Sequence, residues 1–194
     1  MALRRGFKAE AHKIAREIRE ELKLTPAAPL DPWKLAEYLE IPVLPLSDME
    51  KLAPEAVHYF SAVNTSEFSA MTVFDGTKRI IVHNDVHTKG RQSNDVSHEI
   101  SHGLMLHPPS PALDVSGCRN WNQDIEDEAN WLSGALLISD EAAFNIVLRK
   151  MSIAEAAALY GVSEKLVRWR ISVTGAHQRV ARYRQRRNGR NGGY

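Results

Sequence analysis

The chain has 194 residues, of which 43% are hydrophobic and 25% are charged, and its formal net charge at pH 7 is +1. These values are typical of a globular protein of one domain, or of one domain with a small appendage. No apolar run approaches the ~20 residues of a membrane span, and the single cysteine excludes an internal disulfide, so we expect a cytoplasmic protein without a signal peptide or membrane partner.

Two helices are predicted at the N-terminal end. Between residues 7 and 22, apolar residues recur at helical spacing with charged residues between them. A proline-rich loop follows at residues 24–30. Asp31 and Pro32 are typical of a helix N-cap followed by proline at the first helical position, which predicts a short helix to about Leu39.

Extended segments follow, from which we predict a small sheet. Residues 41–46 contain two prolines and can form only an edge strand. Residues 58–63 and 70–74 are rich in strand-forming residues. Residues 79–83 are predicted to pair with residues 70–74 across a turn at residues 75–77.

The second half of the chain is predicted to be helical. A helix from about residue 93 to residue 107 is capped by Ser93 or Asn94 and ended by Pro108. After a loop, residues 123–138 form an acidic and then apolar helix.

Shorter helices are predicted after this one. Ser139 can cap the first of them, and Ser152 with Glu155 has the form of a capping box. Residues 160–163 indicate a tight turn into a further helix, so that residues 152–172 have the outline of a helix-turn-helix.

The C-terminal end is strongly basic. From Lys165 onwards there are nine Lys or Arg residues and no Asp or Glu. Residues 184–194 have almost nothing to bury, and we expect a flexible tail there. The predicted division is therefore a main domain at residues 1–150, a helical segment packed on it at residues 151–183, and this tail.

The segment with the clearest chemistry is His98-Glu99-Ile100-Ser101-His102. Two histidines at positions i and i+4 point the same way off a helix and can bind one zinc ion. Glu99 lies beside the first histidine, where it can take a proton from water without being a ligand. The alternative is two ordinary helix histidines, but the motif flanks an apolar stripe of Val96, Ile100 and Leu104, which favours the zinc site.

A catalytic zinc ion usually has three protein ligands and one open position. His107 is five residues past His102, which turns it off the metal-facing side, and a lone cysteine is more often a core or loop residue. Helical periodicity favours Glu126 over Glu128 as the third ligand, and the other acids suit the positive end of a helix dipole. The candidates downstream of the motif are His107, Asp114, Cys118, Asp124, Glu126, Asp127 and Glu128.

Two further roles are open in the same region. His58, Tyr59 and His83 are candidates for stabilising an oxyanion, although each is more often a strand residue with a local hydrogen bond. The strand at residues 79–83 could align an extended substrate by strand addition if it edges the cleft.

Longer stretches of the chain resemble the ImmA/IrrE-type zinc metallo-endopeptidases of bacteria and their phages, which are gluzincin-like HExxH proteins. The resemblance covers nearly the whole chain to about residue 175. The similar segments are the opening helix and residues 30–36, 79–84, 97–104, 126–138 and 160–170.

The resemblance implies an α+β fold, with a mainly helical zincin-like metallopeptidase core, a small mixed or antiparallel β-sheet and a C-terminal helix-turn-helix-like segment. It implies that His98, His102 and Glu126 are zinc ligands and that Glu99 is the catalytic base. It also implies a protein substrate, a helix-turn-helix repressor, whose cleavage releases stress-response, prophage or mobile-element genes.

Two other classes of function compete with this one. Residues 152–172 could form a DNA-binding module that reads a base sequence. We expect instead only weak, non-specific contact between the basic C-terminus and nucleic acid. A regulatory protein could also sequester a repressor without cutting it, but such a protein has no need of Glu99. No feature of the sequence identifies the substrate, its cleavage site, an activating signal or the oligomeric state.

Overall fold

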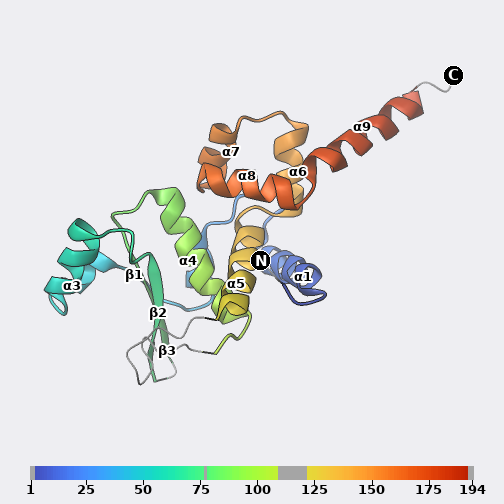
Figure 1. Cartoon of the computed structure of the whole chain (residues 1–194). Coiled ribbons are helices and arrows are strands. Elements are labelled where there is room, and N and C mark those ends of the chain that lie inside the picture. Colours follow the sequence, from blue (N-terminus) through green and yellow to red (C-terminus); the bar gives the residue numbers. More distant parts are fainter. Residues whose placement is uncertain (1–2, 77, 109–121, 192–194) are drawn as a thin grey trace.

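The computed structural model describes residues 3–76, 78–108 and 122–191. These residues form a mainly helical α+β fold, as predicted (Figure 1). In chain order the elements are α1 (Phe7–Glu21), α2 (Pro32–Tyr38), β1 (Val43–Pro45), a 3-10 helix η1 (Leu46–Met49), α3 (Pro54–His58), a π-helix η2 (Tyr59–Val63), β2 (Ala70–Asp75), β3 (Lys78–His83), α4 (Lys89–Leu104), α5 (Gln123–Leu137), α6 (Asp140–Leu148), α7 (Ile153–Tyr160), α8 (Glu164–Val173) and α9 (Ala176–Asn191).

The sheet has three strands in the order β1-β3-β2. β1 is parallel to β3, with Val43 opposite Ile81, and β2 is antiparallel to β3, with Thr72 also opposite Ile81. The hairpin and the proline-containing edge strand are therefore confirmed. Because β3 is central, Ile81–His83 pair with both neighbouring strands, and the expectation that this strand edges a cleft is wrong for that part of it. Lys78–Ile80 pair with β2 alone in the described sheet.

Residues 58–63 form no strand, contrary to the sequence-based expectation. Pro54 at the first helical position opens α3, which continues directly into the π-helix η2. Phe60 packs with Phe68, and this pair lies against Val57 in a small core cluster of its own. Strand propensity reflects packing on a half-buried sheet, and no residue of η2 is buried, so that propensity did not decide the structure here.

Helix α4 begins at Lys89, four residues before the predicted start. Ser93 and Asn94 lie inside the helix, and the N-cap is Thr88, which makes no side-chain cap hydrogen bond. The first turn instead packs closely against Val162, which lies just before α8 in the chain. The approach is so close that a Cβ atom at Gly90 would lie 2.6 Å from the Val162 carbonyl carbon. This polar turn has no apolar periodicity, so the pattern indicated the helix start too late.

The main core lies between α1, α2, β3, α4 and α5, and a second core lies between the end of α5 and helices α6 to α9. In Figure 1, α4 lies between the sheet and α5, and α1 lies beyond α5. Two buried arginines join the cores: Arg19 donates to the Leu136 carbonyl at 2.6 Å, and Arg170 donates to the Ile138 carbonyl at 2.8 Å. They satisfy carbonyls that the end of a buried helix leaves without partners.

The predicted capping sites of the later helices are confirmed. Ser139 caps α6, Ser152 and Glu155 form the capping box of α7, and Ser163 caps α8. Gly161 ends α7 in the left-handed conformation, with φ of 63°. The buried faces of α7 and α8 pack on the rest of the protein rather than standing apart.

Residues 184–191 of the expected flexible tail are helical and belong to the end of α9. α9 continues to Asn191, and residues 181–188 are all exposed. The exposed positions agree with the expectation that little is buried, but Arg and Gln are strong helix formers and extend the helix begun at Ala176. The predicted domain boundaries at residues 150 and 183 stay a prediction.

Within the described ranges, no single helix is both long and apolar enough to cross a membrane. The pair α5 and α6 passes on length and composition together, but it is bent by 53° at its break.

Candidate metal centre

Helices α4 and α5 approach closely because small residues lie between them. Ser97 and Ser133 are both buried at this interface. The Ser97 hydroxyl lies 3.5 Å from the Ser133 carbonyl, and the Ser133 hydroxyl lies 3.4 Å from the Asn94 carbonyl. Each hydroxyl donates to the other helix, so one site can be assembled from side chains of both helices.

Three side chains with metal-binding atoms meet at this interface. His98 and His102 come from successive turns of α4, and Glu126 comes from the first turn of α5, which Asn122 caps. The His98 Nε2 atom lies 3.0 Å from His102 Nε2 and 3.1 Å from Glu126 Oε2. His102 Nε2 lies 3.7 Å from Glu126 Oε1, and the possible ligand atoms all lie within 4.8 Å of one another.

This donor set fits a catalytic zinc ion. Two imidazole nitrogens and one carboxylate oxygen are among the ligand sets of catalytic zinc sites, which keep a fourth position open. Tetrahedral zinc with bonds of about 2.0–2.1 Å places its ligand atoms about 3.3 Å apart. The separations of 3.0, 3.1 and 3.7 Å lie on both sides of that value.

The charges in the cluster favour an ionised carboxylate. Burial alone would raise the pKa of Glu126, but hydrogen bonds and positive charge from His98 and His102 outweigh it and lower this pKa to about 2. Burial lowers the pKa of His98, whereas its hydrogen bond to Glu126 and the charge of Glu99 raise it above the usual value. A carboxylate must be ionised to bind a metal ion, and Glu126 meets that condition.

Glu99 lies beside the cluster and is held from the sheet. The Thr72 hydroxyl on β2 donates a hydrogen bond of 2.6 Å to Glu99 Oε2. Thr72 was not among the predicted site residues, because a single threonine in a strand carries no signal of its own. The contact nevertheless places β2, the free edge of the described sheet, next to the candidate base.

His107 lies outside the metal cluster but touches one of its members. Leu106, with φ of 53°, turns the chain in the left-handed conformation, and the His107 backbone N–H then bonds to the His102 carbonyl at 3.0 Å. This return brings His107 Nδ1 to 3.0 Å from His102 Nδ1, on the side of the ring away from Glu126. The turn away from the metal-facing side was predicted, and the contact with His102 was not.

Glu128, the alternative third ligand, makes different contacts. Its Oε2 atom lies 3.5 Å from His107 Nε2, and its Oε1 atom accepts a hydrogen bond of 2.8 Å from Arg4. The structure therefore brings Glu126, rather than Glu128, to the histidine pair. Asp114 and Cys118 lie outside the described residues.

The suggested oxyanion residues have local surroundings. His58 is exposed at the end of α3. The Tyr59 hydroxyl donates to Glu67, and His83 is buried edge-on against Trp33. None of them belongs to the metal cluster found in the described part of the chain.

Arg79, which was not among the suggested oxyanion residues, places a positive charge next to α4. A Cβ atom at Gly103, directly after His102, would overlap the Arg79 guanidinium, so this glycine lets the side chain lie against the helix. The guanidinium carbon also lies 5.3 Å from the centre of the Phe74 ring.

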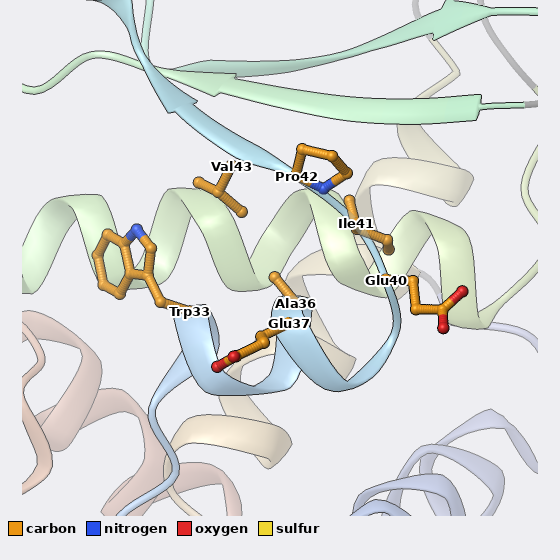
Figure 2. A pocket seen from close by; sticks show the side chains of 7 residues that line it. All are labelled: Trp33, Ala36, Glu37, Glu40, Ile41, Pro42 and Val43. Carbon is orange, nitrogen blue, oxygen red and sulfur yellow. The ribbon is translucent and has the colours of Figure 1, made fainter.

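A separate hollow of about 410 Å³ lies between α2 and the start of β1 (Figure 2). Its lining contains none of the residues of the metal cluster. The lining residues are Trp33, Ala36, Glu37, Glu40, Ile41, Pro42 and Val43.

Comparison with known proteins gives one family. The model of the Peptidase_M78 family, described as the IrrE N-terminal-like domain, matches residues 36–172. The match runs from α2 into α8, so it includes the sheet and the metal cluster and leaves out α1 and α9. A comparison with curated proteins gives no match.

Proposed function

The chain belongs to the Peptidase_M78 family of metallopeptidases, and we propose that it is a zinc-dependent endopeptidase that cleaves a helix-turn-helix transcriptional repressor. The observation that carries the zinc assignment is the convergence of His98, His102 and Glu126 from two helices. The repressor as substrate is supported by the resemblance to ImmA/IrrE-type peptidases, and its cleavage would derepress stress-response, prophage or mobile-element genes.

The proposed mechanism divides the work among few residues. Zinc, held by His98, His102 and Glu126, would supply a Lewis acid that polarises the scissile carbonyl and lowers the pKa of a water molecule towards ~7. Glu99 accepts the proton of the attacking water on its carboxylate and passes it to the leaving amine. Thr72 holds that carboxylate in place from β2.

The outer edge of β2, which no other strand of the described sheet covers, is the surface that we propose for aligning the substrate. Met71 and Val73 flank Thr72 and are 39% and 38% exposed, whereas Thr72 contacts Glu99. An extended segment of the substrate can add to such an edge through backbone hydrogen bonds. We prefer β2 to β3 for this role because Ile81–His83 of β3 already pair with β1 and β2.

The experiment is a Glu99→Gln substitution with two measurements. Bound zinc is measured by elemental analysis, and cleavage of candidate helix-turn-helix repressors is followed by mass spectrometry. We expect one zinc ion per chain to remain and cleavage to fall by at least about 100-fold, because general base catalysis contributes about 10²- to 10⁴-fold. Undiminished cleavage would refute the role of Glu99.

A matched variant tests the metal separately. Glu126→Gln keeps the size of the side chain but removes the charge, so we expect loss of both zinc and cleavage. A protein that binds a repressor tightly in the presence of zinc and leaves it uncut would instead support the alternative, a regulator that sequesters repressors or binds DNA without proteolytic turnover.

A further inference from the structure

The C-terminal part of the chain contains many basic residues and no acidic ones. Of the nine Lys or Arg residues from Lys165 onwards, six lie on α9. This helix lies outside the span that the family model matches, which ends at residue 172. Residues 181–188 are all exposed, and four of them are arginines.

Helix α9 first packs along α6 and then passes its end. Tyr183 packs edge-on against Phe144, with ring centres 5.7 Å apart. Arg184 donates a hydrogen bond of 3.1 Å to the carbonyl of Leu148, the last residue of α6. Beyond this contact α9 extends away from the body of the protein (Figure 1).

A hollow of about 480 Å³ lies where α9 leaves α6. Arg184 and Arg187 form part of its wall, and the exposed Arg149 and Lys150 follow Leu148 directly. The lining contains no carboxylate. The lining residues are Leu148, Tyr183, Arg184, Arg187 and Asn188.

The arginines of this hollow differ from those nearer the core. Arg170 and Arg179 both form ion pairs with Asp140, at 3.1 and 3.9 Å. In the described part of the chain, neither Arg184 nor Arg187 has an acidic partner. The Leu148 carbonyl holds Arg184 in place but does not neutralise it.

The chemistry of α9 argues against a membrane as the partner. A helix that lies in a membrane interface needs an apolar face of large side chains opposite its basic face. Among the exposed residues 181–188, Tyr183 is the only large apolar side chain, and its ring is packed against Phe144.

Helix α8 is poorly suited to read a base sequence. Its buried face, with Leu166 and Val167, packs into the second core. Its exposed first turn carries Glu164, which pairs with Arg168 at 3.0 Å. The Glu164 carboxylate would repel phosphate groups. It also neutralises Arg168 through their ion pair.

We propose that the hollow and its basic rim bind the phosphate backbone of nucleic acid without sequence preference. We call the polar lining residues of this hollow the α6–α9 basic surface: Arg184, Arg187 and Asn188. Guanidinium groups bind phosphate through paired hydrogen bonds, and each phosphate contact releases counterions from the nucleic acid. An enzyme held in this way would stay close to repressors that are bound to DNA.

The proposal does not rest on the proposed peptidase function. The binding experiment uses the full-length Glu99→Gln protein, so cleavage plays no part in the readout. Failure to bind zinc or to cut a repressor would leave the basic surface untouched, and failure to bind nucleic acid would leave the metal cluster untouched.

The test measures binding of a labelled DNA duplex, and of an RNA of the same length, by fluorescence anisotropy between about 50 and 200 mM salt. Binding to two unrelated sequences is expected to be equal. Arg187→Gln should lower the slope of log affinity against log salt by about 0.9 for duplex DNA, and Arg184→Gln with Arg187→Gln should lower it by about 1.8. At the lower salt concentration the double variant should bind roughly 10- to 100-fold more weakly.

The control is Lys165→Gln with Arg168→Gln, which removes the same charge from exposed positions on α8. It should change the slope by much less than the α9 double variant. Circular dichroism checks that α9 remains folded, and the single Arg187→Gln variant keeps the Arg184 contact with α6 intact.

Three outcomes would overturn the proposal. The first is that neither nucleic acid binds at low salt. The second is that the α8 variant loses as much affinity as the α9 variant. The third is that the surface binds vesicles containing phosphatidylserine more tightly than it binds nucleic acid, with the same dependence on Arg184 and Arg187.

Discussion

Each ring nitrogen of His102 has its own neighbour. Nε2 faces His98 and Glu126, whereas Nδ1 lies 3.0 Å from His107. His107 in turn lies 3.5 Å from Glu128, which Arg4 holds from the N-terminal segment. A metal-binding histidine is usually oriented by a hydrogen bond to its other nitrogen, which fixes the tautomer. The left-handed Leu106 supplies the backbone turn that makes this contact.

His107→Leu should therefore weaken zinc binding without removing a ligand. We expect a loss of about 10- to 100-fold in zinc affinity, the usual effect of removing such a partner. The measurement is competition with a chelator of known affinity, in parallel with thermal unfolding of the zinc-free protein. His107→Gln keeps a hydrogen-bonding group and should recover part of the affinity, so equal zinc affinity in wild type and both variants would contradict this role.

Thr72→Val should reduce turnover while leaving the metal in place. Valine has nearly the same shape but cannot donate to Glu99, and a hydrogen bond to a charged group contributes about 1.5–3 kcal/mol, which corresponds to roughly 10- to 100-fold in rate. The measurements are kcat on a cleaved repressor and zinc content. Thr72→Ser retains the hydroxyl and should behave like wild type. A fall in zinc content together with kcat would show that Thr72 supports the fold of the site instead.

At the scale of elements, the site depends on how α4 is held at both ends. Its first turn lies against the chain that enters α8, at Val162, and its last turns face α5 and the sheet. Glycine permits close approach at two points along it: Gly90 faces backbone atoms, and Gly103 faces the end of the Arg79 side chain. The two positions thus have the same residue but different neighbours.

Gly90→Ala should destabilise the protein by about 1–3 kcal/mol, because the new Cβ atom would lie 2.6 Å from the Val162 carbonyl carbon and backbone cannot move aside easily. Gly103→Ala is the matched control, since the flexible Arg79 side chain can move away and alanine favours the helix by about 0.5–1 kcal/mol. Urea unfolding of the zinc-free proteins gives both values. Equal stability of the two variants would show that the contact at Gly90 is not tight.

At the scale of the whole molecule, the metal cluster joins two helices from different parts of the chain. α4 also contacts the sheet and α2, and α5 also contacts α1 and α8. An ion bound between α4 and α5 would therefore stabilise the packing on which both cores depend, because it binds the folded protein only.

Removal of zinc should lower the melting temperature. At a free zinc concentration 100 times the Kd, binding adds about 2.7 kcal/mol, which corresponds to roughly 5–10 °C for a chain of this size. Calorimetry with zinc and with a chelator measures the shift. Glu126→Ala should unfold at the same temperature in both conditions, and a shift that survives in this variant would place the bound metal elsewhere.

The elements that could be predicted from sequence depend on neighbours along the chain. Asp31, Ser139 and Ser152 cap helices through hydrogen bonds to residues two or three positions away. Spacing within α4 likewise sets His98 and His102 on the same side of one helix, whatever surrounds it. These features are local, so they can be deduced before any packing is known.

Only the tertiary structure decided what meets these residues. It turned residues 58–63 into helix, made β2 an edge strand of the described sheet, and brought Thr72 and His107 to the site, whereas Glu126 had already been favoured by helical periodicity. The segments concerned lie far apart in the chain or compete for the same place in the fold. Their contacts follow from how α4, α5 and the sheet pack together, and no local spacing encodes that packing.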